Sequence, residues 1–102
     1  MREIIDTLQH WKASGERVVM ATVIAVHGSA PQPEGAKMLI AESGKIAGSV
    51  SGGCVEAAVA HEAQRVLRSG RPVIVSYGID RSMMWDVGLA CGGTIDVFLE
   101  PV

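Results

Sequence analysis

The 102-residue chain carries a formal net charge of −2, with 48% hydrophobic and 20% charged residues. This balance excludes a disordered segment and predicts one folded domain over residues 1–102. The chain has an acidic balance and no run of Lys or Arg, which argues against nucleic-acid binding, because that needs a basic face. Aromatic residues make up only 4% of the chain, so we expect an aliphatic core.

The hydropathy pattern predicts a cytoplasmic protein without a membrane span. The longest apolar stretch, residues 18–26, is interrupted by Thr22 and is too short to cross a bilayer. Acidic residues at positions 3 and 6 occupy the region where a signal peptide needs an apolar run. In a reducing compartment the two cysteines are expected to be thiols rather than a structural disulfide.

The first half of the chain predicts one helix and three strands. Apolar residues recur at helical spacing from Ile4 to Trp11, and Gly15 can end that helix. Residues 17–26 are β-branched and almost continuously apolar, which is typical of a strand buried on both faces. A loop rich in Pro and Gly follows, and then a strand, a tight turn and a short partner strand are predicted at 36–41, 42–45 and 46–50.

The second half predicts one helix and two strands. A mostly apolar stripe defines the helix, which Gly70 and Pro72 can end; the stripe consists of Val55, Ala58, Val59, Glu62, Ala63, Val66 and Leu67. Residues 72–77 and 93–99 read as strands, and 78–90 as irregular or briefly helical. We therefore predict an α/β (α+β) domain, with a mixed sheet of about five strands and two main helices packed on it.

Cys54 is the first candidate for chemistry. Gly52 and Gly53 permit a tight turn before it, so we expect Cys54 in the first turn of the second helix. Free N–H groups and the helix dipole at that position favour a thiolate and can also receive a phosphate. Ser49 and Ser51 add hydroxyl donors. The alternative interpretation is a small buried residue beside ordinary turn glycines.

Cys91 is the second candidate. It precedes Gly92 and Gly93 at the start of the last predicted strand. Both cysteines of the chain therefore lie beside a Gly-Gly pair, where no side chain blocks the close approach of a ligand. The alternative is coincidence together with ordinary turn chemistry.

The loop at 28–35 is the third candidate. It can form a wall of a pocket in which Ser29 and Lys37 meet an anion, or it can simply connect two strands. His27 ends the preceding strand and could face the site. A histidine at a strand end more commonly makes a local hydrogen bond. We expect no structural zinc site, because the cysteines are 37 positions apart and the histidines are isolated. The glycines fit neither a P-loop nor the dinucleotide fingerprint.

The motifs together resemble a known family. The segments that carry the resemblance lie at 21–23, 28–31, 35–38, 48–56 and 88–95, and include Ser51-Gly52-Gly53-Cys54-Val55-Glu56 and Cys91-Gly92-Gly93-Thr94. They occur in order from about residue 17 to residue 101. In these segments the chain resembles the N-terminal domain of the XdhC/CoxI family of xanthine dehydrogenase accessory factors and carbon monoxide dehydrogenase maturation proteins.

The resemblance implies a non-catalytic chaperone for molybdenum hydroxylases. Such a protein would bind molybdenum cofactor (molybdopterin) and help to deliver or sulfurate it for the apo-enzyme of xanthine dehydrogenase or a CO dehydrogenase-like protein. Cys54 would be the sulfur ligand or carrier and Cys91 a second ligand, which makes both candidate molybdenum contacts. The residues expected to bind the cofactor are Ser29, Lys37, Ser51, Gly52, Gly53, Cys54, Cys91, Gly92 and Gly93.

Family members usually continue into a Rossmann-like domain, whereas this chain ends at Val102, just after the last predicted strand. We therefore expect either an N-terminal domain that works with a separate Rossmann-like chain, or a domain that has kept the fold and changed its task. In both cases we expect a homodimer or a higher oligomer. Two other functions stay open. One is a thiol redox protein in which Cys54 and Cys91 form a reversible disulfide, and the other is an interaction module.

Overall fold

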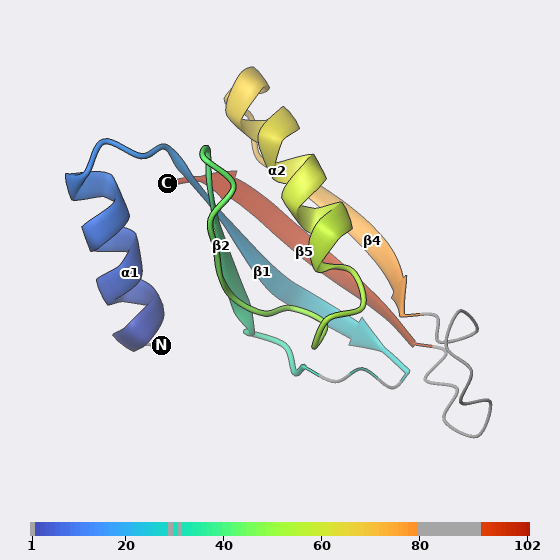
Figure 1. The fold of residues 1–102 in the computed structure, drawn as a ribbon. Coiled ribbons are helices and arrows are strands. Elements are labelled where there is room, and N and C mark those ends of the chain that lie inside the picture. The colour runs from blue at the N-terminus through green and yellow to red at the C-terminus, as the bar shows by residue number, and fades with distance from the viewer. Residues whose placement is uncertain (1, 29, 31, 80–92) are drawn as a thin grey trace.

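The computed structural model describes residues 2–28, 30, 32–79 and 93–102 (Figure 1). In chain order the elements are α1 (Arg2–Ala13), β1 (Val18–His27), β2 (Lys37–Ala41), β3 (Ile46–Gly48), α2 (Glu56–Ser69), β4 (Val73–Ile79) and β5 (Gly93–Pro101). These elements confirm the helices and strands that the sequence predicts. The predicted irregular segment at 78–90 begins inside β4, and its residues from 80 onward lie outside the described part.

The five strands form one sheet in the order β3-β2-β1-β5-β4. The predicted number of strands and helices is confirmed, but every neighbouring pair is antiparallel, so the expectation of a mixed sheet is wrong. The reason is the path of α2, which carries the chain from the β3 edge to the opposite edge at β4 (Figure 1). β3 and β4 run in the same direction but are not neighbours, so this crossover creates no parallel pair.

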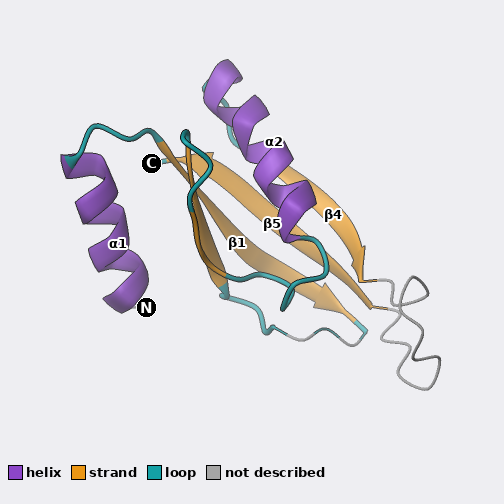
Figure 2. Ribbon diagram, viewed as in Figure 1, coloured by secondary structure: helices purple, strands orange, loops and turns teal. Residues whose placement is uncertain are grey.

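Helix α2 covers one face of the sheet (Figure 2). Its buried residues Val59, Ala63, Val66 and Leu67 pack on alternate residues of the strands, among them Val19, Ala21, Val23, Met38, Ile40, Ile95, Val97 and Leu99. Full burial of one such aliphatic side chain stabilises a fold by about 1.5–3 kcal/mol. The helix ends at Gly70, whose left-handed backbone (φ 71°) lets its N–H donate to the carbonyl of Val66.

Helix α1 packs on the opposite face, at one end of the sheet. Trp11 is its buried anchor and lies with Val18, Leu39 and Ala41. In β2 the side chains from Met38 to Ala41 are buried on both faces. In β1 only the start is buried on both faces, at Val18 and Val19, and the face opposite α2 becomes exposed by Ile24, so the prediction for residues 17–26 is wrong for most of that face. Among the described residues Trp11 is the only buried aromatic side chain, so the predicted aliphatic core is confirmed for that part of the chain.

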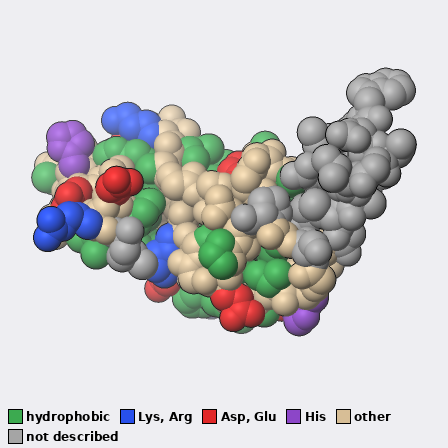
Figure 3. Space-filling view, turned by 90° about the horizontal axis from the view of Figure 1, so that it is seen from below, with side chains coloured by type: hydrophobic (Ala, Val, Ile, Leu, Met, Phe, Trp, Pro, Cys, Tyr) green, Lys and Arg blue, Asp and Glu red, His purple; other side chains and the backbone are tan. Residues whose placement is uncertain are grey.

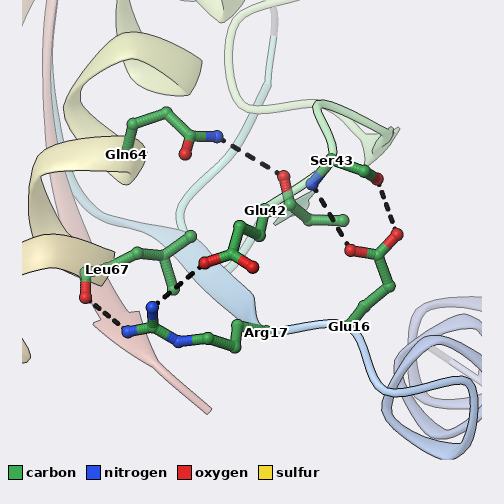
Figure 4. A network of polar contacts seen from close by, with 7 residues as sticks. Glu16, Arg17, Glu42, Ser43, Gln64 and Leu67 are labelled. Carbon is green, nitrogen blue, oxygen red and sulfur yellow. Dashed lines mark hydrogen bonds and ion pairs between the residues drawn. The ribbon is translucent and has the colours of Figure 1, made fainter.

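A polar network fastens the C-terminal part of α2 to the sheet (Figure 4). The Arg17 guanidinium, just before β1, donates to the Leu67 carbonyl of α2 and to the Glu42 carboxylate at 3.0 Å. The Gln64 amide donates to the carbonyl of Ala41 at the end of β2. These contacts join the C-terminal part of α2 to the start of β1 and the end of β2.

Candidate functional site

The 49–55 loop connects β3 to α2 and carries Cys54, the first of the two candidate cysteines. Gly48, the last residue of β3, has a left-handed backbone (φ 79°) that turns the chain into the loop. The N–H of Ser49 then donates to the Lys37 carbonyl at 3.1 Å. Val50 is fully buried in the core beneath α2, which ties the loop to the sheet. Gly52 and Gly53 also have positive φ angles, 69° and 107°, as the tight turn requires.

The Glu56 carboxylate is the centre of this loop. It accepts five hydrogen bonds from the loop: from the hydroxyls of Ser49 (2.6 Å) and Ser51, and from the N–H groups of Val50 (3.1 Å), Ser51 (3.0 Å) and Gly53 (2.9 Å). The Ser51 side chain is completely buried, so its hydroxyl depends on these partners. One carboxylate thus organises the whole segment before the helix.

The two serine hydroxyls also accept hydrogen bonds. Ser49 Oγ accepts from the N–H of Gly52, and Ser51 Oγ accepts from the N–H of Val55, both at 2.9 Å. We expected N–H groups at this helix start that are open to a phosphate. The N–H groups of Ser51, Gly52 and Gly53 already donate within the loop, so a phosphate would have to meet other N–H groups of the helix start, and cofactor binding by these residues stays a prediction.

The pKa of Glu56 is lowered to about 2. Partial burial of the carboxyl group raises its pKa, but the hydrogen bonds from Ser49, Ser51 and the backbone N–H groups favour the charged form more strongly in sum. Glu56 is therefore an anion at neutral pH, and within the described residues its charge is matched by donors of the loop rather than by a Lys or Arg side chain.

Cys54 is exposed and precedes the helix. Helix α2 begins at Glu56 and its N-cap position is Val55, so the prediction that Cys54 lies in the first helical turn is wrong. The physical reason is the turn before the helix: Gly52 and Gly53 have positive φ angles, and the Glu56 side chain reaches back to the Gly53 N–H and holds that non-helical turn. Exposure also excludes the alternative of a small buried cysteine.

Lys37 does not join this loop through its side chain. Thr22 is its partner in the β1–β2 pairing, and the Lys37 ammonium donates to Thr22 Oγ1 at 3.0 Å. Met38 belongs to the core beneath α2, so the neighbouring Lys37 side chain lies on the other face of the sheet. The structure therefore does not bring the Lys37 ammonium together with Cys54.

The remaining predicted site residues are only partly described. Ser29, Cys91 and Gly92 lie outside the described residues, and whether Cys54 and Cys91 share a site stays a prediction. Gly93 is the first residue of β5, where it is buried and pairs with Ile79. In the described part of the chain, no three of His, Cys, Asp and Glu lie close enough together to hold a metal ion.

His27 makes the local hydrogen bond that its place at a strand end predicts. Its Nε2 lies 3.3 Å from the Asp96 carboxylate, and Ser76 Oγ donates to the same carboxylate at 2.6 Å. The hydrogen bond from Ser76, together with the contact with His27, lowers the pKa of Asp96.

Glu56 is the residue that sequence reasoning missed. A signal was present, because a glutamate at the start of a predicted helix can reach back to the N–H of a residue three positions before it, here Gly53. The two serines upstream gave a further signal, since hydroxyls near a helix start commonly join such networks. Both signals point to the glutamate, whereas the chemistry of a thiol points to the cysteine beside it.

The XdhC and CoxI family matches the chain over residues 11–78, two thirds of its length, including the 49–55 loop and Glu56. The chain belongs to this family. The predicted resemblance is thereby confirmed. No helix in the described ranges of this family member is both long and apolar enough to cross a membrane.

Three relatives illustrate the match. The molybdenum cofactor insertion chaperone PaoD of Escherichia coli (strain K12) is 44% identical over 87 residues, which are 85% of this chain and 27% of that protein. A probable xanthine dehydrogenase subunit of Bacillus subtilis (strain 168) is 33% identical over 89 residues, with the same coverage. A crystal structure of a xanthine dehydrogenase from Bacillus halodurans superposes with a TM-score of 0.79 at 40% identity, over 96% of this chain and 30% of that one.

The chain thus spans about a quarter of the length of the curated relatives it matches.

Proposed function

We propose that this chain acts in the maturation of molybdenum hydroxylases, where it binds molybdenum cofactor as cargo through the Cys54 thiol. The observation that carries the proposal is an exposed cysteine on a loop whose neighbouring backbone groups are held by hydrogen bonds. The E. coli relative that is named a molybdenum cofactor insertion chaperone supports the choice of cargo. Thiolate sulfur is a soft ligand and suits a metal centre that already has sulfur ligands.

The donors around Cys54 limit how the cargo is held. Because the N–H groups of Ser51, Gly52 and Gly53 are used inside the loop, they offer little to the phosphate of the cofactor. Sulfur contact at Cys54 is therefore the main bond from this loop. Cys91, Gly92 and Ser29, which we predict from the family resemblance, would supply further contacts.

The test is a binding measurement on the purified chain with molybdenum cofactor, with molybdenum retained after gel filtration as the readout. Cys54→Ser is expected to weaken binding at least about tenfold, because even supporting residues of a metal site contribute tenfold or more. His61→Ala, an exposed change on α2, is the matched control and should bind like the unaltered chain. Equal binding by Cys54→Ser and the unaltered chain would contradict the proposal.

Delivery and sulfuration of the cofactor are the later steps of the proposed role. The recipient would be the apo-form of a xanthine dehydrogenase or a related molybdenum hydroxylase, in keeping with the names of the relatives. We propose that a separate Rossmann-like chain and self-association as a homodimer complete the assembly. Light scattering of the purified chain, alone and with such a partner, tests both points. A monomer that binds no partner would contradict them.

A further inference from the structure

The position of Cys54 is held by its two neighbours rather than by packing. Gly53 before it donates its N–H to the Glu56 carboxylate at 2.9 Å. Val55 after it donates its N–H to Ser51 Oγ, and the Ser51 hydroxyl in turn donates to the same carboxylate. Both sides of the exposed cysteine are thus connected to Glu56 through one or two hydrogen bonds.

Val50 and Ser51 are buried and anchor the start of the loop, but the exposed tip at Gly52 and Gly53 has little packing to fix its shape. Gly52 and Gly53 are exposed, both have positive φ angles, and a side chain at Gly53 would meet no other atom within 4 Å. Glycine has more backbone freedom to lose than any other residue, so a segment of this composition samples many conformations unless hydrogen bonds hold it. In this loop those bonds converge on one carboxylate.

We propose that Glu56 is the positioning residue for Cys54: its carboxylate fixes the 49–55 loop in the one conformation that presents the thiol to the cargo. This inference rests on the proposed function of Cys54 as the cargo's sulfur ligand. Glu56 does not contact the cargo. It acts by fixing the backbone and by occupying N–H groups that would otherwise attract an anion to the loop.

The positioning role requires a negative charge on the side chain of residue 56. A carboxylate offers acceptor positions on both oxygens, which suits five donors. A glutamine of the same length has one acceptor oxygen, and its NH₂ group would face donors. Glu56→Gln therefore disrupts the loop although its side chain has almost the same shape. An aspartate keeps the charge on a shorter side chain and is expected to restore part of the order.

The first readout is independent of any cargo. Amide hydrogen exchange at Ser51, Gly53 and Val55 is expected to accelerate at least about tenfold in Glu56→Gln, because hydrogen bonds to a charged acceptor are among the stronger ones. Glu56→Asp should give an intermediate rate. Glu62→Gln is the matched control, since it removes a carboxylate from the same helix that pairs with Arg65 at 3.6 Å and takes no part in the hydrogen bonds of the 49–55 loop. It should leave exchange in the loop unchanged.

The second readout is affinity for molybdenum cofactor. Glu56→Gln is expected to weaken binding about tenfold while leaving the Cys54 thiol in place, with Glu56→Asp between it and the unaltered chain. If Glu56→Gln does not fold, Ser49→Ala takes its place. That variant removes one donor to the carboxylate, and about threefold weaker binding is expected.

The outcomes separate the two proposals. Unchanged loop exchange in Glu56→Gln, or faster exchange with unaltered cofactor affinity, would overturn the positioning role while leaving the function of Cys54 intact. Unaltered affinity in Cys54→Ser would instead overturn the proposed function, and with it the presentation of a cargo ligand. Faster exchange and weaker binding together in Glu56→Gln, with Glu62→Gln unchanged, are the result that supports the inference.

Discussion

The two ends of α2 are fastened to the sheet in opposite ways. At the N-terminal end, one carboxylate, Glu56, accepts five hydrogen bonds from residues at most seven positions away. At the C-terminal end, one guanidinium, Arg17, joins Glu42 and Leu67, which are 25 and 50 positions away (Figure 4). The first arrangement shapes a short loop, and the second fixes the helix relative to strands that are distant in sequence.

Exposure adds to the contrast. The Arg17 and Glu42 side chains are 56% and 52% exposed, so water and salt screen their ion pair. Glu56 instead bonds to the fully buried Ser51 and to backbone groups of a loop anchored in the core. The comparison predicts that the N-terminal end of α2 is the more sensitive to substitution, and it is the end that carries Cys54.

The largest effect is expected at Gly48, which starts the loop. A side chain there would meet the Lys37 carbonyl oxygen and lie 2.8 Å from Ile4 Cδ1, on a backbone that only glycine adopts easily. Gly48→Ala should therefore lower the free energy of unfolding by about 3 kcal/mol. Gly53→Ala is the matched control, because it has a positive φ but open space around it, and about 1 kcal/mol is expected. Urea unfolding measures both, and equal losses would contradict the account.

Acid should weaken the N-terminal end next. The folded pKa of Glu56 is about 2, below its ordinary value of 4.5. Its contribution is therefore complete above pH 4.5 and is lost as the pH falls toward 2. We expect a loss of about 1–2 kcal/mol over that range, reduced from the full linkage value because water screens this partly exposed group. The free energy of unfolding, measured across this pH range, should depend less on pH in Glu56→Gln than in the unaltered chain. The same pH dependence in both proteins would argue against the assigned pKa.

A smaller effect is expected at the C-terminal end. Arg17→Ala removes the hydrogen bond to the Leu67 carbonyl and the pair with Glu42, and should destabilise the fold by about 1 kcal/mol. Glu42→Gln removes only the exposed ion pair, and less than about 0.5 kcal/mol is expected. Urea midpoints at low and high salt measure both changes. A Glu42→Gln loss as large as that of Arg17→Ala would show that the ion pair, not the carbonyl contact, holds this end.

The smallest effect on stability is expected at Cys54 itself. Its side chain is exposed, so Cys54→Ser should change the free energy of unfolding by less than about 0.5 kcal/mol. A thermal melt beside that of the unaltered chain checks this. A large loss of stability would mean that the thiol is part of the packing, and any loss of cofactor binding could then no longer be assigned to a missing ligand.

Hydrophobic periodicity was enough to predict the elements of this fold but not their arrangement. The stripe from Val59 to Leu67 and the alternation in β5 follow directly from residue spacing. The antiparallel pairing depends on α2 crossing to the far edge of the sheet, and no local pattern specifies that crossing. Residues 38–41 are apolar on both faces, so their sequence does not tell which face Lys37 shares.

The candidate site, like the fold, could be predicted from the sequence only in part. The cysteine beside two glycines was visible in the sequence, but its exposure was not, and the role of Glu56 depends on the turn that those glycines allow. Surface charge follows composition more directly. On the face seen in Figure 3, basic side chains of the described residues are separated from one another and have acidic ones nearby. That distribution agrees with a chain whose acidic residues only slightly outnumber its basic ones, for a net charge of −2.

The central claim, that one carboxylate organises the loop carrying Cys54, is tested most directly by an NMR pH titration of Glu56. We predict that the side-chain carboxyl carbon titrates with a pKa of about 2. The amide protons of Val50, Ser51 and Gly53, which donate to that carboxylate, should shift with the same midpoint. A midpoint near the ordinary value of 4.5, with those three amides unaffected, would contradict it.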